Sequence, residues 1–260
     1  MLKGKSAIVT GSTSGIGLGI ARCLAAQGAD VLLNGFGDRG EIAALCESLG
    51  REFGVRVAYD GADMSKPAEI KAMVANAEQA FGKVDILVNN AGVQHVAPVE
   101  DFPEDAWERV ISINLSAVFY GTRYALPGMK ARNWGRIINI ASVHGLVASA
   151  NKSAYVAAKH GVVGLTKTVA LETALTNVTC NAICPGWVLT PLVQKQIDAL
   201  AEKNGWSNEQ AGRELLREKQ PSETFVTPEQ LGELAVFLSL EAASNMRGAA
   251  INMDGGWLAR

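Results

Sequence analysis

The chain has 260 residues, of which 48% are hydrophobic, and its formal net charge at pH 7 is −2. This length and apolar content suit one α/β domain spanning 1–260, and the balanced charge without a basic block argues against nucleic acid and anionic membranes as partners. The first apolar run begins at Ser6, which leaves no room for a signal peptide, and no apolar run approaches the ~18 residues of a membrane helix, so we expect a cytoplasmic protein.

Apolar runs typical of strands alternate with helical patterns along the chain, and no linker or internal repeat divides it. We predict strands near 6–10, 30–34, 55–60, 84–89, 135–141, 178–184 and 249–253. We predict helices near 15–27, 40–53, 66–81, 104–131, 153–175 and 228–239. This alternation predicts a doubly wound, Rossmann-type parallel sheet of about seven strands, with helices on both faces. Ligands of such sheets bind at the carboxyl ends of the strands.

The first strand ends at a glycine-rich turn, and a helical pattern follows. The turn reads Gly11-Ser12-Thr13-Ser14-Gly15-Ile16-Gly17. Glycine allows a sharp turn and close approach of a ligand, and a helix start offers free N–H groups and the positive end of the helix dipole. We therefore predict a cradle for the pyrophosphate of a dinucleotide, although the spacing differs from the commoner Gly-x-Gly-x-x-Gly. The alternative is a tight turn without a ligand.

Tyr155 and Lys159 stand four positions apart in the predicted helix 153–175, so their side chains lie on one face, one turn apart. Free tyrosine has a pKa near ~10 and is a poor acid or base at neutral pH. A neighbouring ammonium favours the phenolate and would lower that pKa, which permits proton exchange with an alcohol or ketone. Alone, the spacing is a weak indication, because such pairs are common on surface helices.

The stretch 190–220 interrupts the alternation of strands and helices. Leu192, Val193 and Ile197 suit one amphipathic helix, and Leu215 and Leu216 suit another. Two extra helices overhanging the strand ends predict a lid over the site. The alternative is a structural insertion.

The glycine-rich turn and the Tyr155–Lys159 pair belong to a set of short motifs that follow one another along the chain. They are Thr10-Gly11-x-x-x-Gly15-x-Gly17, Asn89-Asn90-Ala91-Gly92, Asn114, Ser142, Tyr155-x-x-x-Lys159 and Pro185-Gly186. In order and spacing the set resembles the short-chain dehydrogenase/reductase family over essentially the whole chain. The resemblance implies hydride transfer between a nicotinamide and a carbinol carbon, which the cofactor performs and the protein positions.

The resemblance also implies a role for each of four catalytic residues. Tyr155 would be the general base in oxidation and the general acid in reduction, while Lys159 would lower its pKa and hold the nicotinamide ribose. Ser142 would donate a hydrogen bond to the reacting oxygen. Asn114 would sit at a backbone irregularity that seats a water beside the lysine; a solvated or capping asparagine is the alternative.

A larger set of residues is implied to bind the cofactor. Asp63 would accept a hydrogen bond from the adenine amino group, unless it caps the following helix, and Thr190 would bind the carboxamide. The complete set is Gly11, Thr13, Ser14, Gly15, Ile16, Gly17, Phe36, Asp63, Met64, Asn90, Gly92, Ile140, Tyr155, Lys159, Pro185, Gly186, Val188 and Thr190.

Selection between NAD and NADP is expected at the end of the second strand. A 2′-phosphate needs an arginine or lysine, and none stands at 12–14 or 34–38, with Arg39 the nearest. The acidic residue that usually marks NAD preference in the family is also absent, and Asn34 takes its place. The missing cation favours NAD, and an arginine at Gly35 is expected to move the preference toward NADP.

The substrate is expected to be a small 3-hydroxy carboxylate. Within the family, the segments 92–95, 142–155 and 255–257 most resemble members that act on such acids. One ammonium and several hydrogen-bond donors suit a carboxylate better than a neutral ketone, and two tryptophans could wall the methyl end. The expected substrate residues are Gln94, Ser142, His144, Lys152, Tyr155, Trp187, Gln196 and Trp257. Taken singly, Lys152 and the glutamines read as solvated surface residues.

Two other functions stay open. One is a related enzyme acting on another ketone, such as a 3-oxoacyl thioester or a sugar acid. The other is a nucleotide sensor without catalysis, because fold alone does not fix function. The resemblance further implies a homotetramer. The four cysteines show no Cys-x-x-Cys pair, and we expect no bound metal.

Overall fold

Seven parallel strands form one sheet in a computed structural model of the protein, which describes residues 1–259. The strands are β1 (Ser6–Val9), β2 (Asp30–Asn34), β3 (Val57–Asp60), β4 (Ile86–Asn89), β5 (Gly135–Ile140), β6 (Val178–Pro185) and β7 (Ala250–Met253). Their order is β3-β2-β1-β4-β5-β6-β7, so the winding reverses between β1 and β4. A ligand crevice is expected outside the carboxyl ends at this reversal. The predicted fold class is confirmed.

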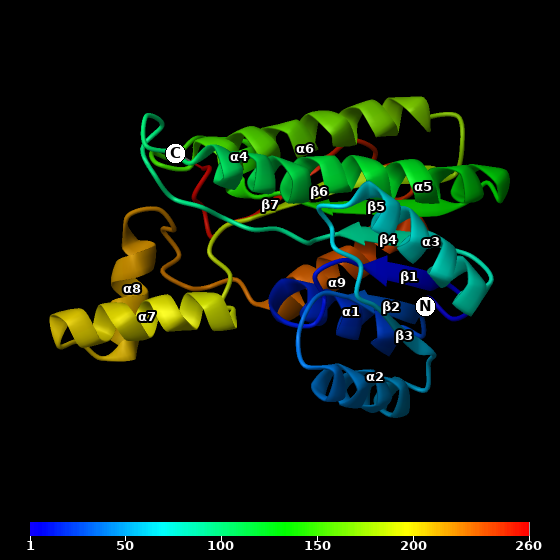
Figure 1. Cartoon of the computed structure of the whole chain (residues 1–260), viewed down its shortest axis with the longest axis horizontal. Coiled ribbons are helices and arrows are strands. Elements are labelled where there is room, and N and C mark those ends of the chain that lie inside the picture. Colours follow the sequence, from blue (N-terminus) through cyan, green and yellow to red (C-terminus); the bar gives the residue numbers. More distant parts are fainter. Residues whose placement is uncertain (260) are drawn as a thin grey trace.

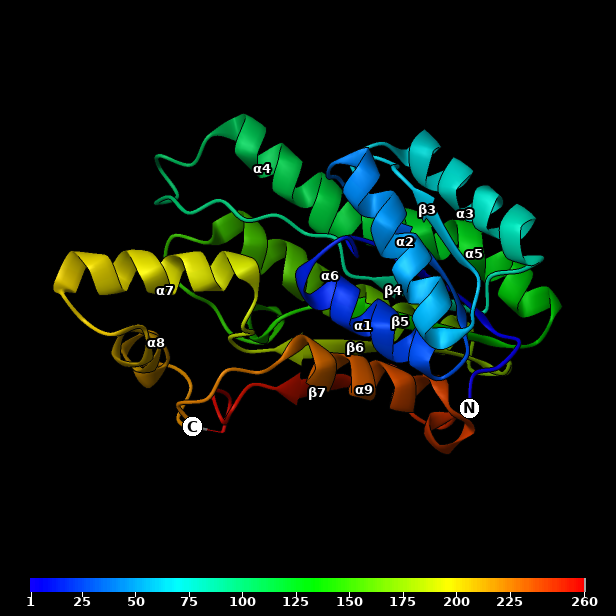
Figure 2. The ribbon, with the colours of Figure 1, turned by 90° about the horizontal axis from the view of Figure 1, so that it is seen from below.

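Helices cover both faces of the sheet (Figures 1 and 2). The helices α1 (Gly15–Ala26), α2 (Arg39–Phe53) and α9 (Pro228–Ser239) lie on one face, and α3 (Pro67–Phe81), α5 (Ala117–Ala131) and α6 (Ser153–Glu172) lie on the other. Successive side chains of a strand point to opposite faces. In β1, Ala7 and Val9 therefore pack in one core and Ile8 packs in the other. Burial on both faces explains why the strands read as continuous apolar runs.

The predicted helix 104–131 is not continuous. It consists of α4 (Glu104–Ile111), a π-helical turn η1 (Ser112–Ser116) and α5. Asn114, in the middle of the π turn, is fully buried, and its side chain bonds both backbone groups of Val93. These two hydrogen bonds hold the wider turn in place, and such turns are frequent at functional sites.

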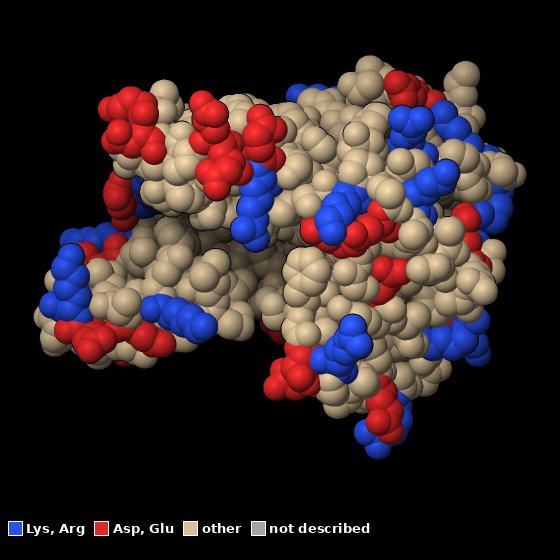
Figure 3. Space-filling model, viewed as in Figure 1, with Lys and Arg blue, Asp and Glu red and all other residues tan. Residues whose placement is uncertain are grey.

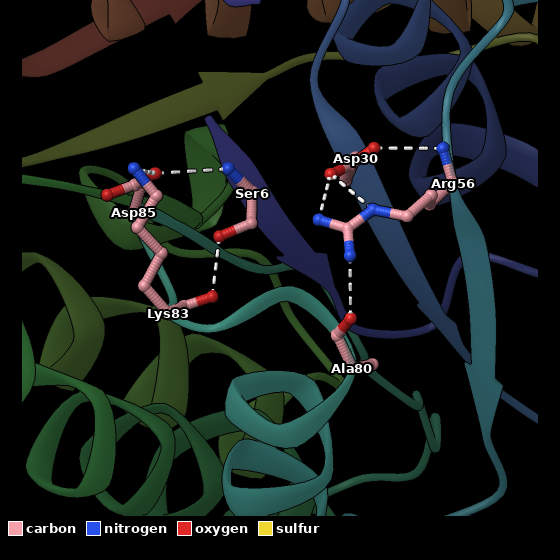
Figure 4. Close-up of polar contacts among 6 residues, drawn as sticks. All are labelled: Ser6, Asp30, Arg56, Ala80, Lys83 and Asp85. Atoms are coloured by element: carbon pink, nitrogen blue, oxygen red, sulfur yellow. Dashed lines mark hydrogen bonds and ion pairs between the residues drawn. The ribbon is translucent and has the colours of Figure 1, made fainter. Parts of the chain in front are cut away.

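Polar contacts tie together the amino ends of the strands (Figure 4). The Asp85 carboxylate accepts a hydrogen bond from the Ser6 backbone N–H at 3.2 Å. Arg56 Nε and Nη2 donate to one oxygen of Asp30 at 3.0 and 2.6 Å, and Nη1 donates to the Ala80 carbonyl at 2.9 Å. These charges therefore serve the scaffold, at the edge opposite to the one where ligands bind.

Two helices extend beyond the carboxyl edge of the sheet, α7 (Pro191–Asn204) and α8 (Asn208–Arg217) (Figures 1 and 2). They have a small core of their own, which includes Val193, Ile197 and Ala211. The interruption predicted for 190–220 is thus a helical pair. Among residues 1–259, no helix has the length and apolar character needed to cross a membrane.

Candidate active site

A cavity of about 590 Å³ opens at the carboxyl ends of the strands, between the body of the protein and the start of α7. Figure 3 shows the hollow on this side of the molecule. All the residues predicted to bind the cofactor line this cavity except Gly17. The cavity joins the glycine-rich turn at one end to Ser142, Tyr155 and Lys159 at the other.

The glycine-rich turn leaves no space for side chains at two of its glycines. Gly11 has a φ of +62°, and a Cβ there would lie 2.9 Å from the Cα of Ala91. A Cβ at Gly17 would collide with the Gly11 carbonyl. Asn90 Nδ2 donates to the carbonyls of Thr10 and Gly11 at 2.8 and 3.0 Å, which braces the turn. Gly17 therefore permits close packing within the turn instead of lining the cavity.

The start of α1 is free to bind an anion. Ser14 occupies the N-cap position without a side-chain hydrogen bond to the helix, and the first turn contains no acidic residue. The first N–H groups of a helix lack partners within it, and the helix dipole favours negative charge there. Gly15 and Ile16, the first helical residues, line the cavity. These features fit the pyrophosphate of a dinucleotide.

Asn34, at the end of β2, serves as a brace. Its Oδ1 accepts from the Gly11 N–H at 3.2 Å, and its Nδ2 donates to the carbonyls of Asp60 and Ala62 at 3.1 and 2.9 Å. The side chain is buried and joins the ends of three strands. Its amide groups are therefore engaged in bracing the turn, although the residue also lines the cavity. Arg39, the cation left in doubt by the sequence, begins α2, is exposed, and does not line the cavity.

Asp63 and Met64, which the sequence predicts to contact the adenine, line the cavity beyond the end of β3. One oxygen of Asp63 accepts from the backbone N–H and the hydroxyl of Ser65, at 2.9 and 2.7 Å, and these hydrogen bonds lower the pKa of the carboxyl. The Asp63 side chain does not cap α3, whose N-cap residue is Lys66. The second oxygen, 3.8 Å from Lys66 Nζ, is available to a ligand.

The Tyr155–Lys159 pair lies beside the end of β5. Lys159 is 4% exposed, and its Nζ donates to the Ile140 carbonyl at 2.7 Å and lies 5.6 Å from the centre of the Tyr155 ring. Burial lowers the pKa of Lys159 to about 8 and raises the pKa of Tyr155, while a hydrogen bond with Ser142 acts to lower the tyrosine pKa. The pKa of Tyr155 is thus raised where the sequence predicted a fall, because desolvation outweighs the hydrogen bond with Ser142.

Asn114 does not line the cavity, and it is neither solvated nor a cap. Its Oδ1 accepts from the Val93 N–H at 2.8 Å, and its Nδ2 donates to the Val93 carbonyl at 2.9 Å. The contact fixes the segment after β4, which carries Gln94, against the helix. The backbone irregularity implied by the family resemblance is therefore present in the free protein.

A second cavity, of about 240 Å³, adjoins the first, and Trp187 lines both. It collects His144, Lys152, Trp187 and Trp257 from the predicted substrate set. His144 links it to the reacting residues, because its Nδ1 lies 3.3 Å from Ser142 Oγ and its ring centre lies 6.0 Å from that of Tyr155. Burial and the charges of Lys152 and Lys219 lower the pKa of His144 to about 4, so the imidazole is neutral at pH 7.

Two predicted substrate residues lie apart from this group. Gln94 is exposed and lines only the larger cavity. Gln196 is exposed on α7 and lines neither cavity, so its predicted place in the site is not seen in this conformation. The apolar face of α7, with Val193 and Ile197, packs toward α8 and leaves Gln196 outside.

Lys219 lines the second cavity, and sequence reasoning missed it. It follows α8 and lies far along the chain from the other residues of the cavity. Its sequence context, Glu-Lys-Gln, reads as a solvated surface stretch, so only the folded structure indicates its position.

The comparisons with known proteins agree with this geometry. A family model described as short chain dehydrogenase matches residues 5–201. The chain belongs to this family. It is 66% identical over 260 residues, all of both chains, to a D-beta-hydroxybutyrate dehydrogenase of Cupriavidus necator. It is also 54% identical, over 98% of this chain and 99% of the relative, to a D-beta-hydroxybutyrate dehydrogenase of Rhizobium meliloti.

Solved structures show the same fold. The crystal structure of L-sorbose reductase from Gluconobacter frateurii, complexed with NADPH and L-sorbose, matches this dehydrogenase with a TM-score of 0.95 at 33% identity, covering 100% of this chain and 98% of that one. The predicted family is therefore confirmed.

Proposed function

We propose that the protein catalyses the reversible oxidation of D-3-hydroxybutyrate to acetoacetate with NAD. The proposal is carried by one observation: a cavity with cationic and hydrogen-bonding side chains adjoins Ser142 and Tyr155 through His144. Full-length identity of 66% to a D-beta-hydroxybutyrate dehydrogenase supports the same substrate. The glycine-rich turn and the open start of α1 support a nicotinamide dinucleotide in the larger cavity.

In oxidation, Tyr155 takes the proton of the substrate hydroxyl, and Ser142 donates a hydrogen bond to the same oxygen. A nicotinamide held in the larger cavity would supply the acceptor for the hydride that leaves the carbinol carbon. Tyr155 must be a phenolate for this step, yet burial in the free protein raises its pKa. The ammonium of Lys159 and the positive charge of the oxidised nicotinamide ring both favour the phenolate, so we expect the tyrosine pKa to fall when cofactor binds.

The carboxylate of the substrate is placed by Lys152 and His144 in the second cavity. The neutral His144 ring carries one proton, and its Nδ1 lies 3.3 Å from Ser142 Oγ. We assign the proton to Nε2, the tautomer that can bind a carboxylate, and the Ser142 hydroxyl turns from Nδ1 to the substrate oxygen when substrate binds. That Nε2 is buried and has no hydrogen-bond partner among the described residues. It can therefore donate to a carboxylate oxygen, and Lys152 supplies the charge.

The test is NADH formation from a panel of alcohols in both enantiomers. We expect D-3-hydroxybutyrate to give the highest kcat/KM, with its L enantiomer, 2-butanol, sugar acids and long 3-hydroxyacyl thioesters all at least about tenfold lower, since each lacks a charge-assisted contact or the fit. A higher kcat/KM for a thioester or a sugar acid would replace the proposed substrate. Tight NAD binding without turnover of any alcohol would indicate a sensor.

The cofactor preference gives a mutational prediction. The wild type should favour NAD over NADP by at least about tenfold, because a 2′-phosphate would find no cation at the end of β2. Gly35 is a poor place to add one, since its φ is +149° and a Cβ would lie 2.6 Å from Thr13 Oγ1. Phe36 is 71% exposed and lines the cavity, so Phe36→Arg should raise kcat/KM with NADP.

The ratio of kcat/KM values for the two cofactors is the readout, and Phe36→Gln is the uncharged control. Equal use of NAD and NADP by the wild type would show that Arg39 reaches the 2′-position.

The helices α7 and α8 are proposed to close over the bound ligands. Gln196 is exposed on α7 and lines neither cavity, so a movement of α7 would bring it to the site. Hydrogen exchange across 190–220 should slow when cofactor and substrate are both bound, because closure excludes water from a hydride-transfer site. With cofactor alone, this slowing of exchange across 190–220 should be absent. Identical exchange with and without ligands would contradict a lid.

A homotetramer is proposed from the family resemblance. Apolar side chains at Phe119 on α5 and at Leu171 on α6 are 44% and 79% exposed, which suits burial against other copies. Light scattering should give four times the 27.4 kDa chain mass. A monomer mass at micromolar concentration would contradict the assembly.

A further inference from the structure

Two ammonium groups line the second cavity. Lys152 stands immediately before α6, and its Nζ lies 6.0 Å from the centre of the Trp187 ring. Lys219 follows α8, and its Nζ lies 5.8 Å from the Trp257 ring and donates to Ser149 Oγ at 3.4 Å. The two cations thus line one cavity and come from different parts of the chain, one from the residue before α6 and one from the segment after α8.

Little negative charge balances this pair. The ion pair of Lys219 is with Glu218 at 3.7 Å, and the Glu218 side chain is 82% exposed, so the contact is weak. Within residues 1–259, Lys152 takes part in no ion pair. Burial and then the charge of Lys219 lower the pKa of Lys152. An anion between the two ammonium groups would remove this repulsion.

Two buried polar atoms of the same cavity also lack partners. His144 is 5% exposed, and neither its Nε2 nor the Nε1 of Trp187 has a hydrogen-bond partner among the described residues. Buried donors are nearly always hydrogen-bonded in native proteins, so such atoms indicate a ligand. Both residues line the cavity that holds the two ammonium groups. Two cations, the Trp187 N–H and the unpartnered His144 Nε2 thus line a cavity that suits one carboxylate.

We propose that Lys219 is a substrate-binding residue, whose ammonium binds the carboxylate of the 3-hydroxy acid opposite Lys152. The inference rests on the proposed function and extends it. A carboxylate held by Lys152 and Lys219 joins the body of the protein to the end of α8, so only an anionic substrate ties the overhanging helices to the site. Lys219 thereby selects for a charged substrate as well as binding it.

The test compares Lys219→Met with two controls. Lys219→Arg retains the charge, and Lys203→Met removes an exposed lysine of α7 that lines neither cavity. In Lys219→Met, KM for D-3-hydroxybutyrate and the inhibition constant of butyrate should both rise about 5–20-fold. This factor is at the lower end of the effect of losing a charge-assisted hydrogen bond, because Lys219 is partly exposed to solvent. The value of kcat and the KM for NAD should stay within about twofold, because the reacting residues are untouched.

Calorimetry with NAD present measures the binding of butyrate and of the neutral butyramide. These two affinities separate the role of Lys219 from the proposed function. Lys219→Met should weaken butyrate binding and leave butyramide binding unchanged. If the wild type binds butyrate through Lys219 but does not oxidise 3-hydroxybutyrate, the proposed function fails and the anion site stands. If KM and butyrate affinity in Lys219→Met equal those of Lys203→Met, the role of Lys219 is overturned while the proposed function stands.

Discussion

Replacing Tyr155 by phenylalanine should lower kcat for D-3-hydroxybutyrate by at least about 10²–10⁴-fold and leave NAD affinity nearly unchanged. The substitution removes only the hydroxyl that exchanges the proton, and general acid–base catalysis contributes factors of this size. The ring packs in a small core with Val110, Ala154 and Ala158, so the phenylalanine retains the shape of the site. Steady-state NADH formation gives kcat, and calorimetric titration gives the NAD affinity.

Tyr124→Phe is the matched control, because that residue packs against the core of the sheet and lines neither cavity. It should have wild-type kinetics. Near-normal activity of the Tyr155 variant would contradict the role of Tyr155 as general base.

Removing the Lys159 ammonium should both lower kcat and weaken NAD binding. In Lys159→Ala, kcat should fall about 10²-fold or more and the Kd for NAD should rise about tenfold, because the ammonium both favours the phenolate and is proposed to hold the ribose. Lys159→Met fills the buried volume and should show the same double loss, which separates the lost charge from a cavity.

Lys167→Ala removes an exposed lysine from the same helix and serves as the control. A variant at 159 that loses kcat while binding NAD normally would contradict the dual role and leave the lysine with a function in proton transfer alone.

The order of strands and helices could be predicted because each depends on local pattern. Apolar runs bounded by glycine and polar residues marked all seven strands, and the glycine-rich turn of residues 11–17 follows the first one as predicted. The switch between β1 and β4 then follows from right-handed crossovers on both faces. The same order brings the ends of β1, β5 and β6 to one edge, where the cavity opens.

Features that depend on distant partners could not be predicted from local pattern, and the irregularity at Asn114 was implied by the family resemblance alone. The π turn at Asn114 is held by Val93, 21 residues away, and nothing in the local sequence indicates that pairing. The bracing role of Asn34 could not be read from its position at the end of the second strand, because its three hydrogen bonds involve segments that only the sheet brings together. The pKa of Tyr155 was expected to fall, since the spacing of Tyr155 and Lys159 reveals their proximity but not the burial that desolvates both.

The positions of Lys219 and Gln196 relative to the substrate cavity also depend on packing between segments far apart in the sequence. The sequence places both near a predicted lid, and only the packing of α7 on α8 decides which side chain reaches the cavity. The roles proposed for the substrate residues therefore depend on experiment more than those of the scaffold.

The central claim is that a cationic pocket beside Tyr155 selects a small 3-hydroxy carboxylate. Its most direct test is the kcat/KM of the wild type for D-3-hydroxybutyrate against that for its methyl ester, at saturating NAD. The ester retains the reacting carbon and loses the charge. We predict a preference for the acid of at least about tenfold, since one charge-assisted contact contributes about 1.5–3 kcal/mol. Equal values for acid and ester would contradict the pocket and the function proposed from it.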